Sequence, residues 1–364
     1  MARFLNKTLL QLEKGLEHVT RRVEQRLFAH DHLTIHPYRS YGNDKIMHLR
    51  GRVLEDEGIL EARATDSIYT NLRNMIRRIE SDEIANVGLR FTYGDYSTQT
   101  LTDEEGYYDM MFEVPTPELN TNAAGVKIEV TAVPEGYEHR LGHVANQEVV
   151  LPTDKTDFGV ISDIDDTIMR TGATRIYRMA YNTFLKNDQT RSPLEGAAEF
   201  YQQLKGGQDG TRDNMFFYVS SSPWNIYDFL VQFMRNHDFP VGPLLLKDYG
   251  FSETQTGFTD HLGHKYREIS RILQTYPDME FILVGDSGQK DPFIYQKIVE
   301  DFPGRIMAVL IHSAHRKRHS NKVKAAIEAI HERVPTLLLD DVAPARDLAE
   351  GLGWVPPSVE ALVA

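Results

Sequence analysis

The chain has 364 residues, of which 41% are hydrophobic and 26% charged, and its formal net charge is −13. This length suits two domains, and the composition is that of an ordinary soluble protein with both helices and strands. The acidic balance argues against nucleic acid as a partner, the lack of cysteine excludes disulfides and thiol chemistry, and no segment approaches the roughly 18 apolar residues of a transmembrane span. The first residues lack the apolar core of a signal peptide, so we expect a cytoplasmic protein.

The chain begins with apolar residues spaced by three or four, which is typical of one face of an amphipathic helix. They are Leu5, Leu9, Leu12, Leu16, Val19, Val23 and Leu27. We therefore predict an N-terminal helix and linker over residues 1–45. Packing on the body of the protein or on a partner chain is the first interpretation of the apolar face, and peripheral contact with a membrane surface is the alternative.

Between residues 46 and 153 the hydrophobic period changes to two, which indicates strands. Residues 98–114 contain two strand-like pieces around a turn with Gly106, which predicts a hairpin. One helical pattern, from Ile68 to Ile79, interrupts the strands. This part of the chain predicts a small antiparallel β-sandwich-like domain with a helical insert and no catalytic residues. The strand pattern rests on Met47, Leu49, Val53, Val87, Leu89, Phe91, Val126, Ile128 and Val130.

From residue 154 to residue 364, short apolar runs alternate with helical segments. Three of these segments begin with a capping residue followed by proline, at Ser192, Ser222 and Asp291. Buried strands that alternate with helices predict an α/β domain with a parallel sheet covered by helices on both faces. The apolar runs lie at residues 158–161, 215–219, 281–284, 305–311 and 336–339.

Two carboxylates follow the first apolar run of this second domain. Asp163 and Asp165 are two residues apart, so an extended chain directs both side chains to one side. They would face the crevice beyond the carboxyl edge of the sheet, where open α/β folds bind ligands. Two like charges this close need a cation or a proton between them. The pair therefore indicates the outline of a phosphoryl-transfer site.

Three further polar motifs stand at strand ends or helix starts of the same domain. Residues 220–223, Ser-Ser-Ser-Pro, join an apolar strand to a helix start, where backbone amides favour an anion. Lys265 lies in Gly-His-Lys at the opening of a helix, and Asp286 and Asp291 lie in Gly-Asp-Ser-Gly-Gln-Lys-Asp after a strand. A single serine is more often a helix cap and a single lysine a surface charge. The order of the motifs at successive strand ends is what indicates a site.

In this order and setting, the four motifs resemble those of the haloacid dehalogenase-like (HAD-like) superfamily, which are Asp-x-Asp-x-Thr, a Ser or Thr, a Lys, and Gly-Asp-x-x-x-x-Asp. Over about residues 156–340, the wording Asp-Ile-Asp-Asp-Thr-Ile, Ser-Ser-Ser-Pro-Trp-Asn and Gly-His-Lys-Tyr-Arg-Glu-Ile is similar to the catalytic domain of actin-patch-associated phosphatidate phosphatases and their bacterial relatives. The resemblance implies a HAD-like, Rossmann-like fold. It also implies magnesium-dependent hydrolysis of a phosphomonoester through an aspartyl phosphate.

The resemblance assigns the chemical steps to four side chains. Asp163 would attack phosphorus, one of the covalent routes open to a carboxylate. Asp165 would protonate the leaving oxygen and then deprotonate water. Ser220 and Lys265 would bind the phosphoryl oxygens and stabilise the charge of the transition state.

The resemblance also implies a magnesium site and further substrate contacts. Magnesium prefers hard oxygen ligands. Asp163, Asp286 and the backbone carbonyl of Asp165 would hold the ion, with Asp291 as a ligand through water or as support. Asp166 is assigned to capping or orientation. The remaining substrate-binding candidates are Thr167, Ser221 and Arg170.

The identity of the substrate is the least constrained part of the prediction. Basic and aromatic residues between positions 169 and 191 suit a phosphate headgroup with an apolar body, and this interval leaves room for only a small lid. A helix packed on its apolar side with solvated arginines outside is the alternative for this interval. The resemblance makes a lipid phosphate, most simply phosphatidate, the expected substrate. A soluble or protein-borne phosphomonoester is the second interpretation. The third is an interaction protein with a vestigial phosphatase site, against which the complete set of motif residues argues.

Overall fold

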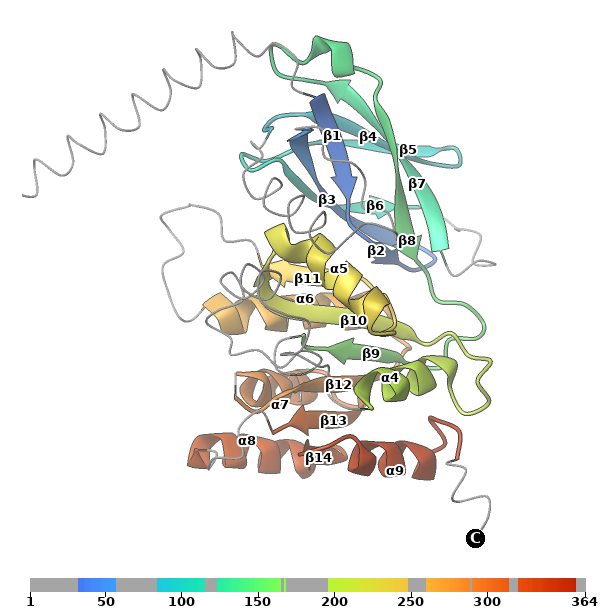
Figure 1. The fold of residues 1–364 in the computed structure, drawn as a ribbon, viewed down its shortest axis with the longest axis vertical. Coiled ribbons are helices and arrows are strands. Elements are labelled where there is room, and N and C mark those ends of the chain that lie inside the picture. The colour runs from blue at the N-terminus through green and yellow to red at the C-terminus, as the bar shows by residue number, and fades with distance from the viewer. Residues whose placement is uncertain are drawn as a thin grey trace, which may run out of the picture.

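The computed structural model describes residues 32–56, 84–114, 123–164, 167, 196–247, 260–288, 290–313 and 320–357. Within them the chain forms a largely antiparallel sheet that packs on the edge of a parallel α/β sheet (Figure 1). The predicted N-terminal helix and the helical insert at 68–79 lie outside the described residues. Among the helices of the described ranges, none has the length and apolar character needed to cross a membrane.

The first sheet runs in the order β1-β3-β2-β8-β7-β4-β5, and β6 pairs with β3. All pairs are antiparallel except β2 with β8. The apolar residues of the period-two pattern meet in one core, which confirms the expected antiparallel sheet. Its strands are β1 (His32–Pro37), β2 (Ser40–Gly42), β3 (Ile46–Asp56), β4 (Gly88–Tyr93), β5 (Tyr96–Leu101), β6 (Tyr107–Glu113), β7 (Ala123–Ala132) and β8 (Val144–Val150), with a short 3-10 helix η1 (Glu138–Arg140).

Two details of this sheet differ from the predictions. The sheet begins at His32 rather than at residue 46, because the short strands β1 and β2, which the 1–45 range treats as linker, pair with β3. The predicted hairpin over 98–114 is wrong, because β5 pairs with β4 whereas β6 pairs with β3. The carboxylate of Asp103 accepts the amides of Glu105 and Tyr107 and so shapes a turn that carries the chain from one strand pair to the other.

The second sheet is parallel throughout, in the order β11-β10-β9-β12-β13-β14. After β9 the chain forms β10 and β11 on one side of β9. It then returns and forms β12, β13 and β14 on the other side, so the strand order reverses between β9 and β12. At such a reversal the connections diverge and leave a crevice at the carboxyl edge of the sheet. The strands are β9 (Gly159–Ser162), β10 (Met215–Pro223), β11 (Leu244–Lys247), β12 (Phe281–Asp286), β13 (Ile306–His312) and β14 (Thr336–Leu339).

Helices cover both faces of the parallel sheet, which confirms an α/β architecture. Alternate residues of β10 pack in opposite directions: Phe216 and Tyr218 join one apolar cluster, and Phe217 and Val219 join the other. This double burial explains why the strands read as continuous apolar runs. The first cluster includes α4 (Ala197–Gly206), α5 (Tyr227–Asn236) and α9 (Ala343–Gly351), and the second includes α6 (Asp260–Thr275), α7 (Asp291–Asp301) and α8 (Asn321–His331).

The two sheets are held together by aromatic and polar contacts. Tyr38 stacks on Trp224 of the 3-10 helix η2 (Trp224–Ile226), with ring centroids 4.5 Å apart and planes within 8°. The Tyr276 hydroxyl donates to the carbonyl of Gly42 at 2.9 Å. Both tyrosines are buried. The first sheet is therefore packed firmly against the turn after β10 and the end of α6.

A substitution of Gly159 tests the close packing between the central strands β9 and β12. Gly159 of β9 lies opposite Phe281 of β12, and a Cβ atom at Gly159 would overlap the Phe281 ring. Gly159→Ala is expected to lower the free energy of unfolding by about 1–3 kcal/mol. Gly125→Ala on β7, where a Cβ meets nothing within 4 Å, is the control and should change it by less than about 0.5 kcal/mol. Urea unfolding measures both; equal stability of the two variants would contradict the packing argument.

A buried histidine between the sheets predicts a pH dependence. His48 stacks on Tyr41, and its Nε2 lies 2.9 Å from Oγ1 of Thr275. Burial, reinforced by the positive charge of Arg271, lowers the pKa of His48 from 6.5 to about 4. The unfolded chain therefore binds the proton more readily, and the stability from neutral His48 is fully present above pH 6.5 and is lost as the pH falls toward 4.

The loss should amount to about 3 kcal/mol, since each pKa unit corresponds to roughly 1.4 kcal/mol. Urea unfolding at a series of pH values between 6.5 and 4 measures it. His48→Gln is expected to remove this part of the pH dependence, whereas His331→Gln, at the exposed end of α8, should keep it. An identical pH profile for the wild type and His48→Gln is the outcome that rejects the assignment.

Candidate active site

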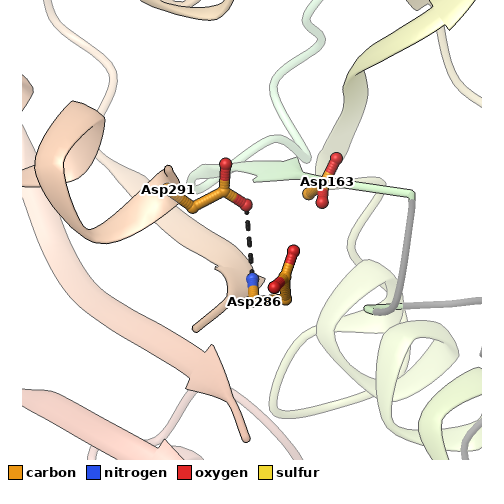
Figure 2. Close-up of side chains that lie close together, drawn as sticks. All are labelled: Asp163, Asp286 and Asp291. Atoms are coloured by element: carbon orange, nitrogen blue, oxygen red, sulfur yellow. Dashed lines mark hydrogen bonds between the residues drawn. The ribbon is translucent and has the colours of Figure 1, made fainter. Parts of the chain in front are cut away.

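Three buried aspartates meet at the reversal between β9 and β12. Asp163 directly follows β9, Asp286 ends β12, and Asp291 begins α7. One carboxylate oxygen of each lies within 4.8 Å of those of the others. Figure 2 shows the three side chains arranged around a common space. The sheet topology therefore brings residues from distant parts of the sequence into one acidic cluster.

Backbone contacts fix the position of these aspartates. The amide of Asp163 donates to the carbonyl of Val284 at 2.8 Å, which continues the pairing of β9 with β12 beyond the strand. The amide of Asp286 donates to Oδ2 of Asp291 at 3.2 Å, the dashed line in Figure 2. Gly285 permits this approach, because a Cβ atom there would overlap the Asp291 carboxylate. The amide of Gly288 donates to Oδ1 of Asp286 at 2.5 Å and so orients that carboxylate.

Lys265 of α6 supplies a positive charge inside the cluster. Its Nζ lies 2.9 Å from Oδ1 of Asp163 and 2.7 Å from Oδ1 of Asp291, and all three side chains are buried. Burial alone would lower the pKa of the ammonium, but the carboxylates of Asp163 and Asp291 outweigh burial and hold the pKa above its ordinary value. Lys265 is therefore charged at neutral pH.

The composition of the cluster fits a small divalent cation. The three carboxylates face one ammonium, so the cluster as described remains negatively charged when all are ionised. Carboxylate oxygens are the ligands that magnesium prefers. Both oxygens of Asp291 are already used, one by Lys265 and one by the amide of Asp286. Asp291 is therefore better suited to a supporting role than to direct coordination.

Hydroxyl side chains lie at the same edge of the sheet. Tyr218 of β10 is opposite Ser162 of β9, so Ser220 lies two residues beyond that ladder, and Asp163 lies one residue beyond it. Ser220 is buried and its Oγ accepts the amide of Ser222 at 2.9 Å, while Ser221 is half-buried. Thr167 is also buried, and in the part of the chain that the structure describes its hydroxyl has no hydrogen-bond partner.

Some predicted site residues cannot be placed. Asp165, Asp166 and Arg170 lie outside the described residues, so their roles stay predictions. His264, next to Lys265 on α6, is buried, and burial lowers its pKa to about 4. Its imidazole is therefore neutral at neutral pH.

Two contacts that support the site were not predicted from the sequence. Tyr295 donates its hydroxyl to the carbonyl of Val284 at 2.8 Å and so ties α7 to β12. Ser162 lies 2.9 Å from the Tyr201 hydroxyl, which anchors the end of β9 on α4. A signal existed for Tyr295, because it stands four residues after Asp291 and thus on the same side of α7. No comparable signal links Ser162 with Tyr201.

Residues 158–313 match the family model described as "Phosphatidate phosphatase APP1, catalytic domain". The matched range runs from the start of β9 to just beyond β13 and contains Asp163, Lys265, Asp286 and Asp291. This part of the chain is therefore similar to a phosphatase catalytic domain.

Two fungal proteins are similar in sequence to part of this chain. Phosphatidate phosphatase APP1 of Saccharomyces cerevisiae is 37% identical over 153 residues, which cover 42% of this chain and 25% of that protein. An uncharacterized protein of Schizosaccharomyces pombe is 23% identical over 211 residues, covering 58% and 33% respectively. The chain thus spans a quarter to a third of the length of these relatives.

Similarity to solved structures is weak. A carbohydrate acetylesterase from Xanthomonas citri is 10% identical, with 83% of this chain and 74% of that chain covered and a TM-score of 0.27.

The ion pairs of Lys265 predict a large effect on stability. Lys265→Met would leave the buried carboxylates of Asp163 and Asp291 without their cation, which is expected to lower the free energy of unfolding by about 3–5 kcal/mol. Lys297→Met removes an exposed lysine that pairs with Asp301 on α7, and it should change the free energy of unfolding little, because solvent screens an exposed pair. Urea unfolding with a chelator present measures both. A Lys265→Met protein as stable as Lys297→Met would show that the buried pairs are not needed for the fold.

Proposed function

We propose that this chain is a magnesium-dependent, HAD-like phosphatase that hydrolyses a lipid phosphomonoester, most simply phosphatidate, through an aspartyl phosphate. The observation that carries the proposal is a buried lysine among three buried aspartates at the carboxyl edge of a parallel sheet. The similarity of residues 158–313 to a phosphatidate phosphatase catalytic domain supports both the reaction and the substrate class.

Asp163 is the nucleophile in this proposal. Its carboxylate oxygen attacks phosphorus, the bond from phosphorus to the ester oxygen breaks, and the leaving oxygen takes a proton from Asp165. Water then attacks the phosphorus of the aspartyl phosphate and gives a proton to Asp165. The bond to Asp163 breaks, and inorganic phosphate leaves. The pairing of the Asp163 amide with β12 supports this role, because it fixes the backbone of the nucleophile.

Lys265 and Ser220 bind the phosphoryl oxygens. The ammonium of Lys265 is charged and is held between two carboxylates before any substrate arrives, so it needs no proton uptake to act. Preorganised charge of this kind stabilises the transition state more than the ground state. The hydroxyls of Thr167 and Ser221 are further candidates for contacts with the substrate.

Asp163 and Asp286 would hold magnesium, with Asp291 keeping Asp286 and Lys265 in place. When bound, the ion supplies positive charge that lessens the repulsion between Asp163 and the incoming phosphate. The Gly288 amide holds Oδ1 of Asp286 and so fixes the orientation of the carboxylate. The excess of carboxylate over ammonium charge in the cluster supports a cation at this position.

The experiment that tests the proposal is phosphate release by the purified full chain from a panel of lipid and soluble phosphate esters. We expect release that needs magnesium, stops with a chelator and is fastest for dispersed phosphatidate. Asp163→Asn should lower the rate by about 10³-fold or more, because it removes the nucleophile. Asp154→Asn, at an exposed position before β9, is the control and should keep full activity.

The possible outcomes separate the competing functions. Faster release from small soluble esters than from phosphatidate would reject the lipid substrate but keep the phosphatase. Activity that persists with the chelator would reject the metal assignment. No release from any ester would favour an interaction protein with a vestigial site.

A further inference from the structure

Arg50 extends from the antiparallel sheet into the domain that carries the aspartate cluster. It lies on β3, and its side chain is only 15% exposed. Its Nη2 pairs with Asp109 on β6 and lies 3.3 Å from Oε1 of Glu268 on α6. Its guanidinium carbon lies 5.2 Å from the centroid of the Trp224 ring. One side chain of the first sheet thus contacts two separate elements of the second domain.

The first of these elements, α6, carries Lys265. Glu268 stands three residues after Lys265, so the two side chains are neighbours on the helix surface. The Glu268 carboxylate is buried and lies within 3.5 Å of Arg271 as well as near Arg50. Arg271 in turn lies 3.3 Å from Asp109. Two arginines and two carboxylates therefore form a closed network that joins β3 and β6 to α6.

The second element is the turn formed by η2, which directly follows β10, the strand that carries Ser220. Trp224 follows Ser220 by four residues and is buried. Its ring contacts Arg50 and is stacked on Tyr38, so two residues of the antiparallel domain hold it in place. A cation near an indole ring gains more when both are shielded from water. The position of this turn therefore depends on the antiparallel domain.

The network cannot lose one member without consequence. Burial alone would lower the pKa of Arg50, but Glu268 and Asp109 outweigh burial and hold it above its ordinary value, so the guanidinium stays charged. A buried carboxylate such as Glu268 is stable only with a cation beside it. Removal of Arg50 would leave the buried Glu268 with the more exposed Arg271 as its cation in this network, and would remove the contact of α6 with β3.

We propose that Arg50 is a positioning residue, which holds α6 with Lys265 and the end of β10 with Ser220 in the arrangement that binds the phosphoryl group. This inference rests on the proposed phosphatase function. It makes the antiparallel domain part of the catalytic apparatus, although none of the residues with a chemical role lies in that domain.

Kinetics of the full chain test the proposal. Arg50→Gln and Glu268→Gln are each expected to lower kcat about 10- to 100-fold, because small displacements of catalytic groups have effects of this size. The double variant should be no slower than the slower single variant, since both changes break one network. Arg50→Lys keeps the charge without the planar fork and should restore part of the activity. Arg90→Gln breaks an exposed pair with Glu129 on the same sheet and should leave kcat unchanged.

A second measurement separates positioning from a failure of the proposed function. Amide hydrogen exchange over residues 220–226 and 260–275 is expected to be faster in Arg50→Gln than in the wild type and unchanged in Arg90→Gln. If the wild type releases no phosphate, the proposed function is rejected while the exchange result still decides the role of Arg50. A folded Arg50→Gln protein with exchange rates like those of the wild type in both segments, or with its kcat within twofold of that of an active wild type, would overturn the inference.

Discussion

The contacts of Lys265 with Asp163 and Asp291, at 2.9 and 2.7 Å, are the interaction on which the parallel-sheet domain depends. Three buried carboxylates this close to one another repel strongly, and burial removes the water that would otherwise screen them. The ammonium offsets that repulsion and in doing so ties together the end of β9, α6 and the start of α7. The charges that would act on a phosphate are thus the same charges that hold these three elements together. Selection for catalysis therefore constrains stability, and selection for stability constrains catalysis.

Much of the acidic cluster was predictable because each residue stands where an apolar pattern ends. Asp163 and Asp286 follow buried strands, and Asp291 precedes a helix-starting proline. The carboxyl ends of parallel strands lie at one edge of the sheet, so residues that follow neighbouring strands lie close together in the fold. The sequence pattern does not show which donors the carboxylate oxygens of the cluster accept. That Asp291 gives both of its oxygens to Lys265 and the Asp286 amide follows only from the folded geometry.

Features that depend on contacts between the two sheets were not predictable in the same way. The polar positions of β3, which alternate with Met47 and Leu49, read as a solvent-facing side of a strand, yet His48 and Arg50 face the second domain. The wrong hairpin has a similar cause, because alternation locates strands but does not choose their partners. The tight connection is instead Gly94-Asp95 between β4 and β5, where Tyr93 lies opposite Tyr96 and Gly94 has a φ of +56°.

The pairing of β13 with β14 has a consequence for aggregation. Residues 158–313 end just after β13, whereas β14 and α9 lie beyond that range. β14 covers the outer edge of β13, with Val309 opposite Thr336 and Ile311 opposite Leu338. A fragment ending at residue 313 would expose the backbone of an apolar strand, which is a template for association with other chains. β14 therefore protects the edge of β13 from such association. The part of the chain that resists aggregation thus extends beyond residues 158–313, the part that matches the family model.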